Sequence, residues 1–294
     1  MTDAATAALF AAAVAVVGMP HGGLDHLVGR AVFQPAAGRW WRTAFLFAYL
    51  GVAAVVVAGW VFAPAVTVVL FFAISAVHFG DDPEQGCLAV VDGGLVVWVP
   101  LLARPDEVAG LLAWVVPGGD VEVVRRAVGD ARPLLMVLVG VFAAHLLSLI
   151  WRGRMWAAVR PALFAGLFAT VPVLVGFGLY FCGWHSLREL AALSRRADPV
   201  RPWHGLAIVV RLAAPRAGLA VAATAVAAWW FAAGRDVTPV VVQAVFLGLS
   251  AVAVPHILLH AAARRLGADP FAGETDPCPT AATTSSSAAA WPAG

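Results

Sequence analysis

The apolar residues of this chain fall in long continuous runs, separated by short clusters of charged residues, proline and glycine. The runs lie at about 4–19, 40–62, 65–79, 88–103, 107–117, 133–151, 160–183, 205–232 and 237–263. A membrane-spanning helix needs about 20 apolar residues. Because the runs are continuous rather than alternating, they predict helices and not the strands of a barrel. We therefore expect an all-α fold, a polytopic transmembrane helical bundle of about eight to nine membrane segments. The run at 107–117 is too short to cross unless it is tilted or re-entrant.

The apolar pattern stops near the carboxyl end of the chain. From Gly267 onward the residues are mainly Pro, Thr, Ser and Ala, without periodicity. Such a composition does not bury enough apolar surface to order a chain. The sequence predicts a transmembrane catalytic domain over 1–263 and a disordered cytoplasmic tail over 264–294.

Composition supports the bilayer as the main partner of this chain. Hydrophobic residues make up 62% of it and charged residues only 12%, whereas soluble domains are about one-quarter charged. The formal net charge of +2 gives no reason to expect nucleic acid. The chain contains no lysine, which excludes a rhodopsin-type protein that holds retinal through a lysine Schiff base. Its three cysteines form no CxxC pair and suggest no disulfide framework.

Five histidines mark the ends of apolar runs: His21, His78, His185, His256 and His260. If the runs cross the membrane in alternation, these histidines share one face. The connections on that face also hold most of the arginines, so the positive-inside rule places the face in the cytoplasm. We expect a multi-pass protein of the cell membrane with its histidine-rich face and carboxyl terminus in the cytoplasm.

Carboxylates accompany these histidines at helical spacing. Asp25 lies four residues after His21, Glu189 four residues after His185, and Asp81 three residues after His78. Ionisable groups at membrane depth are costly and mark function by default. Neutral imidazoles and carboxylates converging from several helices are what a metal site in a bundle needs, with Asp25 or Asp81 orienting imidazoles from outside. A haem between paired histidines and a histidine-lined proton pathway remain alternatives.

The other histidines have simpler interpretations. His145 stands alone in an apolar run and is expected to hydrogen-bond a neighbouring helix. His204 follows Arg201-Pro202-Trp203 and indicates an interfacial position. His26 is either interfacial or a residue that supports the metal ligands.

Four of these motifs together resemble a known family. Pro20-His21-Gly22-Gly23-Leu24-Asp25-His26, His78-Phe79-Gly80-x-Asp82, Trp184-His185-Ser186-Leu187-Arg188 and Gly248-Leu249-Ser250…Pro255-His256 closely resemble the Brp/Blh family. Its members are the membrane-embedded β-carotene 15,15′-dioxygenases of bacteria and archaea. The resemblance runs from about residue 10 to residue 263.

The resemblance implies a polytopic enzyme that uses Fe(2+) and O2 to cleave the central double bond of β-carotene into two molecules of retinal. A retinal-binding rhodopsin is then a candidate recipient of the product. The family's iron is held by four histidines, and His21, His78 and His185 match three of them. Glu189 stands where the family has the fourth. The expected ligands are therefore His21, His78, His185 and Glu189, with His256 as the alternative to Glu189.

Two other functions remain open from the sequence. Membrane di-iron desaturases and hydroxylases use clustered histidine boxes, and only His256-x-x-x-His260 resembles one. A carotenoid-binding or carrier protein without catalysis would use its histidines structurally. Iron content separates a carrier from an oxygenase, and the product separates the two kinds of oxygenase.

Overall fold

The computed structural model describes residues 3–80, 88–116, 121–232 and 235–268. Within these ranges every regular element is a helix, as expected for an all-α fold. The α-helices are α1 (Ala4–Ala13), α2 (Asp25–Ala37), α3 (Trp41–Phe62), α4 (Pro64–Phe79), α5 (Leu88–Gly93), α6 (Leu95–Ala103), α7 (Pro105–Val115), α8 (Val121–Asp130), α9 (Arg132–Trp151), α10 (Met155–Thr170), α11 (Val173–Gly178), α12 (Leu187–Ala197), α13 (Pro202–Phe231) and α14 (Val237–Leu266). Between them lie the π-helices η1 (Val14–Gly18) and η4 (Leu179–Ser186) and the 3₁₀-helices η2 (Met19–Leu24) and η3 (Gly38–Trp40).

Four helical stretches of the described chain are long and apolar enough to cross a membrane: Ala4–Phe62, Arg132–Trp151, Pro202–Trp230 and Val237–Leu266. Two shorter helices, α4 and α10, are also apolar. Many outward side chains are large and apolar; for example, Trp151 is 92% and Phe62 is 86% exposed. Surfaces of this kind require lipid rather than water around them. The chain is therefore a membrane protein, whereas the number of eight to nine segments stays a prediction.

The apolar run at 160–183 is not one helix, in contrast to the sequence-based expectation. Helix α10 ends at Thr170, Val171 takes an extended conformation with ψ near 146°, and α11 begins at Val173. The break has a local cause, because Pro172 has no N–H and disfavours the helical conformation of the residue before it. The short run at 107–117 is the 11-residue helix α7, with a proline in its first turn.

The last helix extends further than the apolar pattern does. Helix α14 continues through Arg264 and Arg265 to Leu266, beyond the expected end at 263. Gly267 stops it with a positive φ of 62°, a conformation that glycine adopts without steric cost. Residues 269–294, most of the predicted tail, lie outside the described part of the chain.

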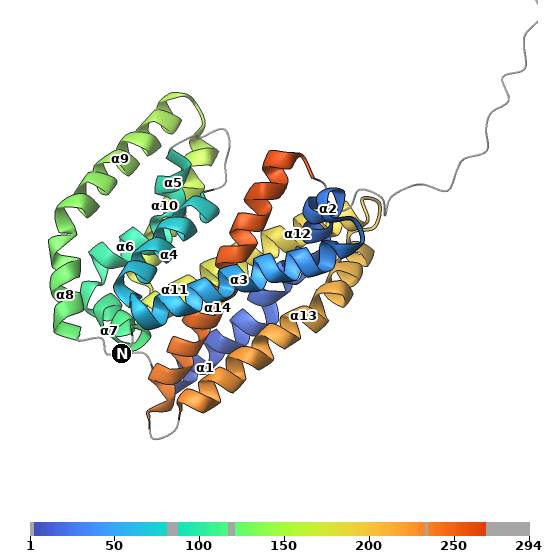
Figure 1. The fold of residues 1–294 in the computed structure, drawn as a ribbon. Coiled ribbons are helices and arrows are strands. Elements are labelled where there is room, and N and C mark those ends of the chain that lie inside the picture. The colour runs from blue at the N-terminus through green and yellow to red at the C-terminus, as the bar shows by residue number, and fades with distance from the viewer. Residues whose placement is uncertain (1–2, 81–87, 117–120, 233–234, 269–294) are drawn as a thin grey trace, which may run out of the picture.

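Helix α14 lies in the middle of the packing. It contacts α1, α2, α3, α7 and α13, and Figure 1 shows it running between α13 and the group that contains α8, α9 and α10. Trp60 of α3 donates a 2.8 Å hydrogen bond to Ser250 Oγ, and the Ser250 side chain is completely buried. Hydrogen bonds between membrane helices contribute about 1 kcal/mol each. This bond holds the Gly248-Leu249-Ser250 segment of α14 against α3, less than two turns before His256.

Candidate metal centre

Four histidine rings meet inside the bundle. The ring centroid of His21 lies 5.5 Å from that of His185 and 5.5 Å from that of His256. The His78 centroid lies 5.0 Å from that of His185 and 5.7 Å from that of His256. The four imidazoles thus form a closed ring, His21–His185–His78–His256, which we call the histidine ring. Its members come from η2, η4, α4 and α14, elements far apart in sequence.

Two members of the histidine ring stand on irregular helical turns. His21 lies in the 3₁₀-helix η2, which follows the π-helix η1, and His185 lies in the π-helix η4. Such departures from α-helical geometry are concentrated at functional sites. His78 lies in the last turn of α4 and His256 in the interior of α14. The irregular turns change the direction in which His21 and His185 project relative to a regular helix.

The glycines around His21 allow two close approaches of neighbouring elements. A Cβ atom on Gly23 would lie 2.7 Å from the carbonyl oxygen of Ala213 in α13, so only glycine fits there. A Cβ atom on Gly18 would lie 2.6 Å from the ring of Phe181, one turn before His185. Both glycines therefore let a neighbouring element come close to the backbone around His21.

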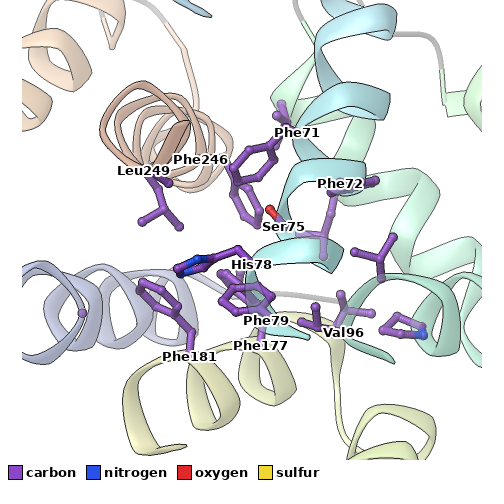
Figure 2. A pocket seen from close by; sticks show the side chains of 18 of the residues that line it. Phe71, Phe72, Ser75, His78, Phe79, Val96, Phe177, Phe181, Phe246 and Leu249 are labelled. Carbon is purple, nitrogen blue, oxygen red and sulfur yellow. The ribbon is translucent and has the colours of Figure 1, made fainter. Parts of the chain in front are cut away.

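An apolar cavity of about 1170 Å³, counting its open mouth, reaches the histidine ring. Figure 2 shows His78 in its wall among phenylalanines of α4, η4 and α14. Apart from three members of the histidine ring, Ser75 supplies the only polar side chain among the described residues of the wall. The site therefore combines nitrogen donors with a hydrocarbon-lined space.

The centroid separations in the histidine ring are close to those around a single metal ion, whereas among the described residues only Asp25, His256 and His260 have ligand atoms that all lie within 4.8 Å of one another. Metal–nitrogen bonds of about 2.1 Å place the centroids of two imidazoles on one ion about 4.5 to 5.3 Å apart. The His78–His185 separation lies in this range, and the other three exceed it by less than half an ångström. His185 is only 4% exposed, and its Nε2 atom has no hydrogen-bond partner in the described part of the chain. A buried polar atom without a partner is costly. A metal ion in the ring would give that nitrogen its partner.

A second cluster adjoins the histidine ring. Ligand atoms of Asp25, His256 and His260 lie within 4.8 Å of one another, a group that could itself hold a metal ion. His256 Nδ1 lies 2.7 Å and His260 Nε2 3.4 Å from Asp25 Oδ1. Tyr49 donates a 2.8 Å hydrogen bond to the other carboxylate oxygen, Asp25 Oδ2. Asp25 is therefore in contact with Tyr49, His256 and His260 at once.

Comparison with known proteins assigns the chain to a family. The sequence model of the β-carotene 15,15′-dioxygenases matches residues 12–262. The chain belongs to this family. It is 31% identical to the probable β-carotene 15,15′-dioxygenase Blh of Halobacterium salinarum, over 85% of this chain and 82% of that protein. It is 24% identical to the β-carotene 15,15′-dioxygenase of the uncultured marine bacterium 66A03, over 84% of this chain and 90% of that protein. No solved structure matches the chain.

Three of the four expected ligands of the family site meet in the histidine ring, and the structure does not bring Glu189 there. The Glu189 side chain is 38% exposed, and its Oε1 atom lies 3.3 Å from Arg188 Nη2. The fourth position of the histidine ring is taken by His256, which is only 8% exposed. Asp81, the other carboxylate considered as an orienting group, lies outside the described residues.

His145, His204 and His26 are not members of the histidine ring, and their simpler interpretations stay predictions. His145 is buried on α9 with its Nε2 atom 3.6 Å from Asp92 Oδ2, next to α5. His204 Nδ1 lies 2.8 Å from Asp198 Oδ2, and the His204 side chain is 62% exposed. His26 is half-buried, beside Asp25 at the start of α2.

Sequence reasoning missed Tyr49, which lies inside the apolar run at 40–62. Its hydroxyl group contacts Asp25, and it also lies 3.2 Å from the carbonyl oxygen of Val252. One signal was available, because the chain has only two tyrosines. A hydroxyl group in the middle of a membrane helix requires a partner.

Proposed function

We propose that this protein is an iron-dependent dioxygenase that cleaves the central 15,15′ double bond of β-carotene with O2 to give two molecules of retinal. The observation that carries the proposal is a ring of four imidazoles, two of them buried, at an apolar cavity in a chain of the β-carotene 15,15′-dioxygenase family. β-Carotene is a hydrocarbon and dissolves in the bilayer core. An enzyme whose cavity lies within the apolar bundle takes up such a substrate without moving it through water.

His21, His78, His185 and His256 are the proposed iron ligands. Four neutral imidazoles suit iron and leave coordination positions open. The set uses His256 in place of Glu189, since the Glu189 carboxylate pairs with Arg188 at the surface. It also uses His78 and His185, which the cluster of Asp25, His256 and His260 would leave without a function.

Different residues of the chain have different roles in the proposed reaction. Iron, when bound, supplies the activation of dioxygen. The four imidazoles hold the ion without adding negative charge. The walls built from Phe72, Phe177 and Phe246 hold the polyene and exclude water, which protects reactive species from side reactions.

The proposed membrane orientation follows from the arginine distribution, and the proposed partner follows from the product. The histidine-rich face and the carboxyl terminus face the cytoplasm of a cell-membrane protein, and the retinal leaves into the bilayer. A retinal-binding rhodopsin in the same membrane is the proposed recipient.

The test is expression in a bacterium that accumulates β-carotene, followed by extraction and chromatography. We expect loss of the orange colour, two molecules of retinal per β-carotene consumed, and purified protein with about one iron per chain. Removing iron with a chelator stops retinal formation, and adding Fe(2+) restores it. His204→Ala is the matched control, since His204 is exposed and pairs with Asp198, and it should keep full activity.

Other outcomes would replace the proposal. A hydroxylated or desaturated carotenoid in place of retinal would indicate the di-iron class. Protein that binds carotenoid but contains no iron and forms no product would indicate a carrier. Iron retained in both His78→Ala and His185→Ala would move the metal to Asp25, His256 and His260.

A further inference from the structure

One carboxylate of the bundle is held from three sides. Asp25 is only 5% exposed and is the first residue of α2, where the positive end of the helix dipole favours a negative charge. Its Oδ1 atom lies 2.7 Å from His256 Nδ1, and its Oδ2 atom accepts the hydroxyl hydrogen of Tyr49 at 2.8 Å. The Asp25 contacts thus join α2, α3 and α14 at the edge of the histidine ring.

These contacts determine which nitrogen of His256 carries the hydrogen. An ionised carboxylate only accepts hydrogen bonds, so the 2.7 Å contact requires a hydrogen on His256 Nδ1. In a neutral imidazole the other nitrogen, Nε2, then has a free lone pair. Histidines that bind metals commonly donate their second ring nitrogen to a carboxylate in this way.

Tyr49 fixes the orientation of the carboxylate itself. With its hydroxyl group on Asp25 Oδ2, it leaves Oδ1 to His256 at 2.7 Å, with His260 farther away at 3.4 Å. The same hydroxyl group lies 3.2 Å from the carbonyl oxygen of Val252, one turn before His256 on α14. Tyr49 therefore links the position of the Asp25 carboxylate to α14, the helix that carries His256.

We propose that Asp25 and Tyr49 are positioning residues that hold His256 as the Nδ1–H tautomer, with its Nε2 lone pair available to the metal. The proposal rests on the proposed function for the identity of that metal site, and it makes Asp25 a support of a ligand rather than a ligand. It also gives Asp25 of the His21 motif a role, because Asp25 contacts His256 on a different helix.

The first readout needs no metal. Nitrogen NMR of the metal-free full-length protein, labelled with ¹⁵N-histidine and measured at pH 8.5 where a free imidazole is neutral, reports the tautomer of each histidine. His256→Ala assigns the signal. We expect His256 as the Nδ1–H tautomer in the wild type and in Asp25→Asn, which keeps an accepting oxygen. Asp25→Leu removes the acceptor and should give the Nε2–H form. An Nε2–H form in the wild type, or an unchanged Nδ1–H form in Asp25→Leu, would overturn the proposal.

The second readout is Fe(2+) affinity, measured by competition with a chelator. Loss of a supporting carboxylate weakens metal binding about 10- to 100-fold, which we expect for Asp25→Leu. Tyr49→Phe removes one hydrogen bond and should weaken binding about two- to tenfold. Tyr180→Phe is the matched control, because Tyr180 is the other tyrosine and packs against Phe79, Phe164 and Phe168. It should leave both the tautomer and the affinity unchanged.

A double variant separates positioning from a merely structural role. Because Tyr49 acts through Asp25, Tyr49→Phe should have no further effect on iron affinity in the Asp25→Leu background, whereas independent contributions would multiply. Multiplying effects, or an equal loss of affinity in Tyr180→Phe, would contradict the proposal. If the wild type shows the Nδ1–H tautomer and yet binds no iron, the hydrogen-bonded pair stands and the proposed iron centre fails.

Discussion

Replacing His256 and Glu189 separately tests the proposed ligand set most directly. His256 is 8% exposed and lies in the histidine ring, 5.5 Å from His21 and 5.7 Å from His78 between ring centroids. Glu189 is 38% exposed and pairs with Arg188 at 3.3 Å. We expect His256→Ala to lose iron and retinal formation, and Glu189→Ala to keep both.

The expected magnitudes differ by about two orders. A four-ligand metal site in a protein binds with about 10–16 kcal/mol, so one ligand corresponds to about 3 kcal/mol, or about 100-fold in the dissociation constant. An exposed ion pair such as Arg188–Glu189 is worth less than about 1 kcal/mol. Because this pair does not touch the metal in the proposed site, Glu189→Ala should change the iron dissociation constant less than about twofold.

The assay is a competition titration of Fe(2+) against a chelator, under anaerobic conditions, with each variant purified in detergent. Thermal unfolding of the metal-free proteins serves as the control for folding, and retinal formation is measured on the same samples. Iron kept by His256→Ala and lost by Glu189→Ala would show the ligand set to be wrong. Iron kept by both variants would indicate a site of three histidines. Glu189→His should bring no gain in affinity if His256 already completes the site.

Three further predictions concern the apolar cavity, the contact between His145 and Asp92, and the membrane topology. Leu249→Trp fills part of the cavity almost two turns from His256. It should lower the rate of retinal formation about tenfold, because it takes up space proposed for the polyene, with iron content unchanged. His145→Ala removes a buried side chain that lies 3.6 Å from Asp92 and should lower the free energy of unfolding by about 1–3 kcal/mol, with iron retained. A reporter that works only in the cytoplasm should be active when it is fused after Ala263. A reporter that works only outside the cell should be inactive there, and its activity would show that the orientation is the opposite one.

The all-α class was predictable because it depends on a property that every apolar run shows locally. Continuous apolar residues without alternation exclude a barrel regardless of how the helices pack. The break before Val173 was not predictable in the same way. Pro172 was visible in the sequence, but a proline inside an apolar run either kinks a membrane helix or ends it, because neighbouring helices can satisfy the freed backbone groups. The packing of α10 and α11 decides between the two.

Three members of the histidine ring were found from motifs, and Glu189 was expected as the fourth ligand because it stands where the family has one and lies four residues after His185. Placing Glu189 on the face of His185 assumed 3.6 residues per turn. His185 lies instead in the π-helix Leu179–Ser186, whose hydrogen bonds span five residues rather than four. The π-helix ends at Ser186, so Glu189 stands on the regular helix α12, where its carboxylate pairs with Arg188. The contact of His256 with His21 spans most of the chain, and local spacing carries no information about it.

The irregular helices η1, η2 and η4 allow the side chains of the histidine ring to meet. A regular helix presents only one face to a given neighbour, yet the histidine ring needs side chains from four elements directed at one point. The π-helix that contains His185 and the paired π- and 3₁₀-segments around His21 provide these directions. Their poorer hydrogen bonding has a cost, which the Gly18–Phe181 and Gly23–Ala213 approaches offset by close packing. Replacing Gly23 by alanine would force η2 away from α13 and displace His21, so it should weaken iron binding although Gly23 carries no ligand atom. A Gly23→Ala variant with normal iron affinity would show that the histidine ring does not depend on this packing.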